Sequence, residues 1–115
     1  MADEPAGSGG TEQPRILTVF RSRTAAGAYD AGYEERAAAM EAKARAMPGF
    51  VEFKSYLAED GEKVSVTVFA SRAEHEAWAK DVDHRAAQAD GRQSFYDEYR
   101  ITVSEVTSER AWHRA

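Results

Sequence analysis

Two segments of alternating apolar and polar residues stand on either side of one short acidic turn, and this pair constrains the fold more than any other feature. Residues 50–57 read FVEFKSYL, residues 63–70 read KVSVTVFA, and the link between them contains Asp60-Gly61. Alternation with period two is typical of a strand with one buried face, and Asp-Gly favours a tight hairpin turn. The middle of the chain is therefore predicted to be an antiparallel β-hairpin.

A predicted helix and a predicted strand flank the hairpin on each side. Residues 15–23 and 99–106 are rich in β-branched and aromatic residues and are predicted strands. Before the hairpin, apolar residues recur at the spacing of one face of a helix, and Pro48-Gly49 should end this helix. These residues are Tyr29, Tyr33, Ala37, Met40, Ala44 and Met47. After it, Ser71-Arg72-Ala73-Glu74 has the form of a capping box, so a second helix should begin near residue 72 and continue at least to Ala89.

This order of elements predicts an α+β fold of the ferredoxin-like type, β-α-β-β-α-β, with a four-stranded antiparallel sheet and both helices on one face. Alternation separates two sheet faces. One should be almost wholly apolar: Leu17, Val19, Val51, Phe53, Leu57, Val64, Val66, Val68, Ile101 and Val103. The other is mixed and contains Ile16, Thr18, Phe20, Phe50, Tyr56, Thr67, Phe69 and Val106. The mixed face is too apolar to remain in water, so we expect a homodimer joined through it.

Length and composition set the class of protein. The 115 residues suit one domain, predicted over residues 15–112, after a disordered leader at residues 1–14 that is rich in Gly, Pro and acidic residues. The leader lacks the apolar run of a signal peptide, so a cytoplasmic location is expected. A net charge of −5 argues against nucleic acid as a partner, and no apolar run is long enough to span a membrane. The absence of cysteine excludes disulfides and thiolate metal sites.

The second predicted helix carries residues that suit a binding pocket. At about 100° per residue, four side chains share roughly a third of a regular helix's circumference: Trp78, His84, Gln88 and Arg92. The indole could stack on a flat ligand, Arg92 and Gln88 could bind its oxygens, and His84 could act as a base or bind iron. Simple packing remains open as well, with Trp78 in the core, the three polar residues in solvent, and Tyr96 and Tyr99 at a helix-strand corner.

A family resemblance rests on four segments: Gly32-Tyr33, MPGFVEFKSY at residues 47–56, DGEKVSV at residues 60–66, and AWAKDVDHRAAQADGRQSFYDEYRITVSEV at residues 77–106. With these segments the sequence resembles the antibiotic biosynthesis monooxygenase superfamily of dimeric α/β barrels, from Arg15 to about Trp112. The resemblance implies a pocket between sheet and helices in each subunit, with Trp78 and His84 at its wall. Some relatives oxidise phenols or anthrones to quinones without metal or flavin, and others degrade haem bound through a helix histidine that His84 matches.

The resulting prediction is a homodimeric, cofactor-independent monooxygenase that oxidises a small flat aromatic molecule with O₂. His84 would be the base, Arg92 and Gln88 would hold the oxyanion, and four further residues would bind the substrate: Trp78, Tyr33, Phe20 and Tyr96. No metal is expected, unless His84 is the axial ligand of a haem. Two alternatives stay open, a haem-binding or haem-degrading protein and a non-catalytic ligand-binding dimer. The chain has no asparagine, whereas the better-studied relatives use one on the first strand, which favours the latter.

Overall fold

The predicted order of elements is confirmed by a computed structural model that describes residues 13–81 and 95–114. Most of the predicted leader, and the predicted site residues His84, Gln88 and Arg92, lie outside these residues. The elements are β1 (Ile16–Thr24), α1 (Tyr33–Ala46), β2 (Phe50–Leu57), β3 (Lys63–Phe69), α2 (Arg72–Ala79) and β4 (Tyr96–Glu105).

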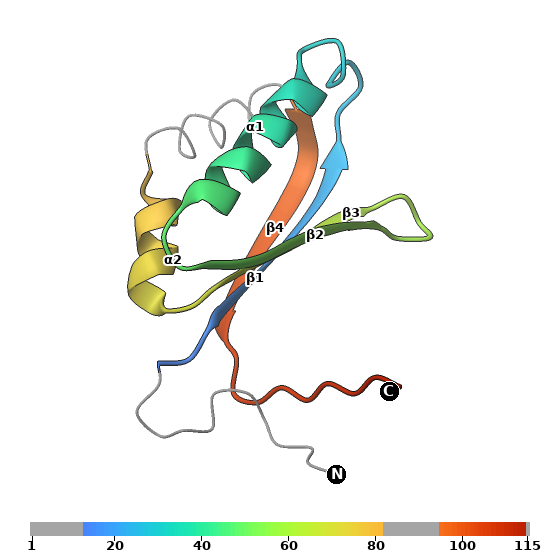
Figure 1. Ribbon diagram of the computed structural model, residues 1–115. Coiled ribbons are helices and arrows are strands. Elements are labelled where there is room, and N and C mark those ends of the chain that lie inside the picture. Colours follow the sequence, from blue (N-terminus) through green and yellow to red (C-terminus); the bar gives the residue numbers. More distant parts are fainter. Residues whose placement is uncertain (1–12, 82–94, 115) are drawn as a thin grey trace.

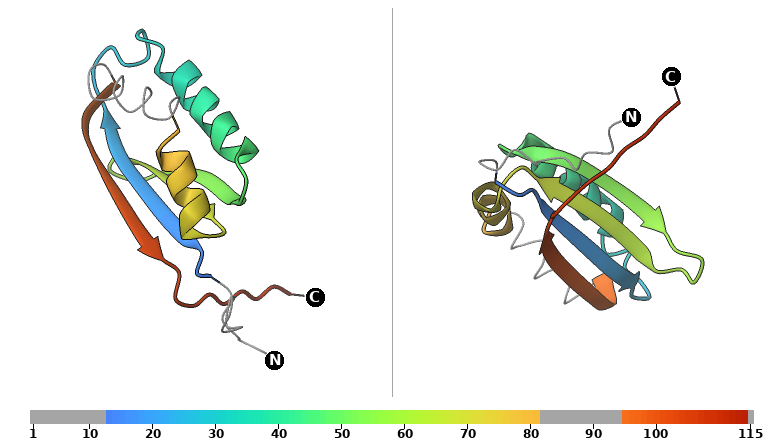
Figure 2. Two further views of the ribbon diagram at one scale, coloured as in Figure 1. Left: turned by 90° about the vertical axis from the view of Figure 1, so that its left-hand side faces the viewer. Right: turned by 90° about the horizontal axis from the view of Figure 1, so that it is seen from below.

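The four strands form one antiparallel sheet in the order β2-β3-β1-β4, so the first and third strands are central. Both α1 and α2 lie against the same face of this sheet, the helix-covered face (Figures 1 and 2). No described helix lies against the opposite face, which we call the helix-free face. The ferredoxin-like α+β fold predicted from the sequence is therefore confirmed. This arrangement positions side chains from every element around the space between sheet and helices.

Helix α1 begins four residues later than the apolar repeat predicts. Residues 26–32 form turns instead, and Gly32 precedes the helix with φ 91°, a left-handed conformation that glycine adopts without strain. At the other end the prediction holds, because Met47 is already extended and Gly49 follows with φ 81°. The early turns move Tyr29 out of the helix, although its ring still contacts Tyr33, with centroids 5.4 Å apart.

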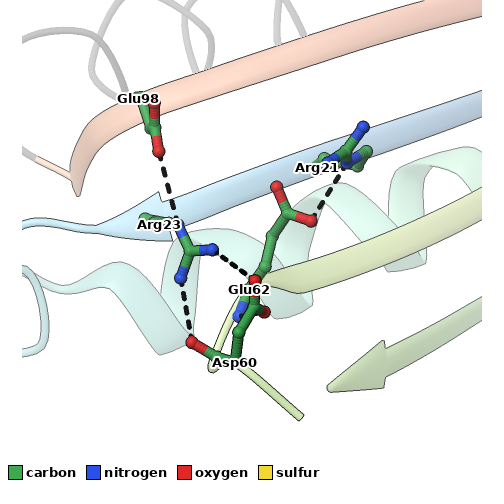
Figure 3. A network of polar contacts seen from close by, with 5 residues as sticks. All are labelled: Arg21, Arg23, Asp60, Glu62 and Glu98. Atoms are coloured by element: carbon green, nitrogen blue, oxygen red, sulfur yellow. Dashed lines mark hydrogen bonds and ion pairs between the residues drawn. The ribbon is translucent and has the colours of Figure 1, made fainter. Parts of the chain in front are cut away.

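The hairpin turn is held by β1 as well as by its own backbone. Gly61 has φ 91°, and the amide of Ala58 donates to the carbonyl of Glu62 at 2.8 Å. Figure 3 shows Arg23 of β1 between Asp60 of the turn, at 2.8 Å, and Glu98 of β4, at 3.3 Å. The backbone amide of Glu62 and the Arg23 guanidinium lower the pKa of Asp60. These exposed ion pairs orient the turn more than they stabilise the fold.

Helix α2 is shorter than predicted. It begins at Arg72, as the capping box predicts, but it ends at Ala79 rather than continuing to Ala89. Just after the helix, the amide of Lys80 donates a hydrogen bond to the Glu76 carbonyl at 2.9 Å, and the amide of Asp81 donates one to the Trp78 carbonyl at 3.1 Å. The Asp81 carboxylate lies 3.6 Å from Lys43 of α1, a tertiary contact that the local alanine-rich sequence does not reveal.

We expect Ser71→Ala to lower the free energy of unfolding by about 1 kcal/mol. The Ser71 hydroxyl accepts a hydrogen bond from the Glu74 amide at 3.3 Å and donates one to the Glu74 carboxylate at 3.1 Å. Its loss leaves an amide of the first turn without this acceptor. Urea denaturation measures the effect, and Ser108→Ala, at an exposed position outside the strands and helices, serves as the control. Equal stability of the two variants would contradict the capping role.

The predicted division of the sheet into two faces was wrong in part. Strand pairing sets Phe20 opposite Ile101 and Thr18 opposite Val103, so these two apolar residues belong to the helix-covered face. A register shift between Phe50 and Glu52 places Phe53 opposite Thr67, on that same face. Period-two alternation groups residues within one strand, but it does not determine how neighbouring strands are phased.

The mixed face is thus the one covered by the helices, not the exposed one that we expected to pair with a second copy. Phe69 and Ile16 are fully buried there, and Phe69 packs with Ala44 and Trp78 in the centre of the core. The helix-free face has an apolar stripe on the two central strands: Leu17, Val19, Val64, Val66 and Val68. Face-to-face pairing of two copies through the helix-free face would therefore use this stripe.

Candidate functional site

A cavity of about 610 Å³ lies between the helix-covered face of the sheet and the helices. Eight of its described lining residues are Phe, Tyr or Trp, and the lining draws on all four strands and both helices. The aromatic members include Phe20, Tyr33, Phe53, Trp78, Phe95, Tyr96 and Tyr99. A mostly apolar space with a few polar groups is the usual form of a small-molecule site.

The four residues predicted to bind substrate all line this cavity, namely Phe20, Tyr33, Trp78 and Tyr96. Three of them form one continuous wall. Tyr96 meets Phe20 edge to face, with centroids 5.4 Å apart and planes at 71°, and it meets Tyr33 at 5.9 Å and 85°. Such edge-to-face contacts stabilise an aromatic cluster and hold its rings in place. Substrate binding by these residues stays a prediction.

Tyr96 presents a neutral hydroxyl in this wall. Burial, together with the neighbouring Tyr33, raises the pKa of Tyr96 well above its ordinary value. The phenol therefore stays protonated throughout the physiological range and can donate a hydrogen bond to a ligand oxygen. The side chain of Tyr96 is partly buried beside the cavity.

Trp78 combines the two roles that the sequence left as alternatives. Its side chain is 8% exposed and packs on Phe69, with ring centroids 5.4 Å apart and planes at 30°. It also lines the cavity from α2. The same indole thus joins the core to the wall of the site, and neither interpretation alone describes it.

The structure places in the site a histidine, His75, that was not predicted from the sequence. His75 of α2 is 9% exposed, lines the cavity, and has Nε2 at 3.1 Å from the Oγ1 of Thr18 on β1. Burial lowers the pKa of His75 below its ordinary value of 6.5, while the carboxylate of Glu76 opposes this shift and the charge of Arg72 adds to it. His75 is therefore a neutral imidazole near pH 7, which is the form that accepts a proton.

The spacing of residues within α2 could have indicated that His75 lies beside Trp78. His75 lies three residues before Trp78, so the two share a helix face once the helix begins at the capping box. Their rings are 6.2 Å apart. The Thr18 partner is 57 residues away in the chain, and only the fold brings it there.

The three residues predicted to be catalytic, His84, Gln88 and Arg92, lie outside the described residues. These residues share a helix face with Trp78 only if one regular helix continues through residue 92, and α2 ends at Ala79. Their roles therefore stay predictions without a geometric basis. Within residues 13–81 and 95–114, no group of three or more His, Cys, Asp or Glu side chains is placed to hold a metal ion. Nor does any described helix have the length and apolarity needed to cross a membrane.

Comparison with known proteins agrees with this fold. The sequence model of the antibiotic biosynthesis monooxygenase family matches residues 15–90, about two thirds of the chain. The chain belongs to this family. The monooxygenase family resemblance noted from the sequence is thereby confirmed, and membership supports a monooxygenase-like role in general terms.

One curated protein and several solved structures resemble the chain over most of its length. The uncharacterised protein YqjZ of Bacillus subtilis is 30% identical over 99 residues, which cover 86% of this chain and 85% of that protein. The structure of Rv0793 from Mycobacterium tuberculosis matches with a TM-score of 0.73 and 19% identity, covering 84% of this chain and 99% of that one. SnoaB, a cofactor-independent oxygenase from Streptomyces nogalater, matches with a TM-score of 0.70 and 13% identity, covering 84% and 96%.

Proposed function

We propose that the protein is a small monooxygenase that oxidises a flat phenolic or anthrone-type aromatic with O₂ and without a bound metal, flavin or haem. The observation that carries the proposal is the aromatic cavity with the Thr18–His75 pair in its lining. Family membership supports the reaction class, and SnoaB, which shares the fold, is itself a cofactor-independent oxygenase. A wall of fixed rings suits a planar ligand, and a neutral imidazole suits proton removal.

In this proposal Thr18 relays a proton from the substrate to His75. The substrate hydroxyl or acidic carbon gives its proton to the Thr18 oxygen, while the Thr18 hydroxyl donates its own to Nε2 of the neutral His75. His75 thus replaces His84 as the base in the reaction first predicted from the sequence. Its burial beside the Phe69 and Trp78 rings supports this role, because a low-dielectric site keeps the imidazole uncharged until it takes the proton.

Proton removal leaves an electron-rich anion that can transfer one electron to O₂. Recombination of the substrate radical with superoxide forms a peroxide, and loss of water from the peroxide completes the reaction. For an anthrone the methylene carbon loses two hydrogens and gains one oxygen atom, and the second oxygen atom leaves as water. The proton held by His75 returns to that water, so the enzyme ends the cycle unchanged.

Oxygen uptake with a hydroxyanthrone tests the proposal directly. Purified protein should consume one O₂ for each quinone formed, faster than the spontaneous oxidation measured without protein. Binding of the aromatic compound with no gain in O₂ uptake would favour the non-catalytic ligand-binding alternative instead.

Haem provides the contrasting control. Its proposed ligand, His84, lies outside the described residues, and the described imidazole in the cavity is already hydrogen-bonded to Thr18. The described part of the lining thus offers haem no imidazole that is free of a hydrogen bond. We expect added haem to give no change in its Soret band. A Soret shift that is lost in His84→Ala would overturn the cofactor-free proposal.

We also propose that two copies of the chain pair through the helix-free face of the sheet. The apolar stripe on β1 and β3 (Leu17, Val19, Val64, Val66 and Val68) is continuous across the two central strands, and a stable dimer would bury roughly 2,000 Å² there. Val66→Glu places a charge at its centre and should convert the dimer to a monomer in light scattering. Ala38→Glu, at an exposed position of α1, should leave the mass unchanged. A wild-type protein that is monomeric at micromolar concentration would end this idea.

A further inference from the structure

Lys63 carries a positive charge to the edge of the aromatic wall. It is the first residue of β3 and lines the cavity. Its ammonium lies 4.7 Å from the ring centroid of Tyr29 and 4.6 Å from that of Tyr33, and it donates a hydrogen bond to the Tyr29 hydroxyl. Two aromatic faces thus hold the ammonium by cation–π contact.

The contacts of Lys63 keep its side chain positively charged. Within residues 13–81 and 95–114, its hydrogen-bond acceptor is the hydroxyl of Tyr29 rather than a carboxylate. Partial burial opposes the charge, but the hydrogen bond to Tyr29 and the neighbouring Tyr33 and Glu34 together raise the pKa of Lys63 above its ordinary value. By contrast, Glu41, an acidic residue in the described lining, is held by Arg45 of its own helix at 2.9 Å.

The sheet register places Lys63 beside the position that a flat ligand would occupy. Lys63 pairs with Ser22 on β1, and Phe20 pairs with Ser65, so Lys63 lies one strand repeat, about 7 Å, from the row of Phe20. Tyr33, on whose ring Lys63 rests, also contacts Tyr96 in the same wall. A planar molecule against Phe20 and Tyr96 would therefore have one edge toward the ammonium.

We propose that Lys63 binds an ionised oxygen of the ligand, a phenolate or carboxylate on a flat aromatic, so that the cavity selects anionic ligands. The inference rests on the proposed function for the ring system and adds the charge that the site recognises. An ammonium has three donors, so it can turn from the Tyr29 hydroxyl to an anionic oxygen and form a stronger, charge-assisted bond. Tyr29 and Tyr33 hold the side chain in place before the ligand arrives.

Alizarin, a flat dihydroxyanthraquinone, is the probe, because its visible absorption shifts when a phenol ionises and it undergoes no turnover. Spectra recorded across pH should show that binding to the wild type lowers the pKa of the bound dye by at least about one unit, which corresponds to about tenfold tighter binding of the anion. Lys63→Met should abolish the shift and weaken binding of the anion about tenfold, while binding of the neutral dye stays the same. Lys63→Gln, which keeps a polar side chain, should behave like Lys63→Met.

Lys54→Met is the matched control, since Lys54 also lies over a tyrosine ring, 5.6 Å from that of Tyr56, but on an exposed part of β2. It should titrate the dye as the wild type does. The proposal is overturned if both Lys63 variants keep the shift, if the wild type binds the two forms of the dye equally, or if the dye does not bind. Oxygen uptake is measured separately. A lowered pKa of the bound dye without O₂ uptake would contradict the proposed oxygenase reaction but support anion binding by Lys63. O₂ uptake without a lowered dye pKa would support the oxygenase reaction and contradict anion binding by Lys63.

Discussion

Replacing His75 by alanine should lower the turnover of a hydroxyanthrone by about 10²- to 10⁴-fold, the usual contribution of a general base. In the proposed reaction His75 receives the substrate proton through Thr18, whose Oγ1 is 3.1 Å from Nε2. His75→Gln is the second variant, since it fills the buried space and can hydrogen-bond Thr18 but does not accept a proton near pH 7. Thr18→Val, which keeps the shape of Thr18 without its hydroxyl, should reduce turnover as well. Stopped-flow absorbance of quinone formation measures all three.

The pH profile distinguishes proton transfer from a structural role. The wild-type rate should fall as pH drops through the pKa of His75, which burial holds below 6.5, and His75→Gln should lose this acidic limb. His113→Ala, at an exposed histidine of the C-terminal segment, should leave rate and profile unchanged. A His75→Gln enzyme with full turnover and the wild-type acidic limb would remove His75 from the mechanism.

The same lowered pKa predicts how stability depends on pH. Below 6.5 the unfolded chain binds a proton at His75 before the folded chain does, so the contribution of His75 to stability is complete above 6.5 and decreases as pH falls through the folded pKa. His75→Gln should reduce this part of the pH dependence of the free energy of unfolding. Denaturation in urea at several pH values between 5 and 8 would measure it.

Trp78→Ala should be the most destabilising single change, with a loss of about 3–5 kcal/mol in the free energy of unfolding. The indole is 8% exposed and packs against Phe69, which is fully buried beside Ala44 at the centre of the core. Removing it leaves a void that the surrounding strands and α1 cannot close. Chemical denaturation is the measurement.

The second tryptophan of the chain supplies the control. Trp112 is 67% exposed in the C-terminal segment, so Trp112→Ala should change stability by less than about 0.5 kcal/mol. In Trp112→Phe the only remaining indole is that of Trp78, and its fluorescence should change when alizarin binds, because this indole lines the cavity. Equal stability of the two alanine variants, or an unchanged emission of Trp78 with dye bound, would contradict the double role of this residue in core and site.

Local patterns were sufficient to predict the order of the elements. Asp60-Gly61 predicted the hairpin, and Ser71 with Glu74 predicted the start of α2, because both signals act over a few residues of backbone. The aromatic residues Phe20, Tyr33 and Tyr96 were chosen from different elements, and all three line the cavity. Large aromatic side chains on the covered face of the sheet and on the helices that cover it are buried in the same space between the two layers.

Only the tertiary structure decided which residues meet. Alternation within a strand does not determine which of its faces lies on the same side of the sheet as a given face of the next strand. The observed strand pairing shows that Ile101 and Val103 lie on the helix-covered face, whereas the valines of the apolar stripe on β3 lie on the helix-free face. Helical periodicity did not predict where α2 ends, close to the contact between Asp81 and Lys43 of α1. Sequence patterns pointed to His84 as the candidate base rather than His75, because the contact between His75 and Thr18 joins residues that are far apart in the chain. Burial that lowers the pKa of His75 is a property of the assembled fold, since no short segment of the chain can remove an imidazole from water.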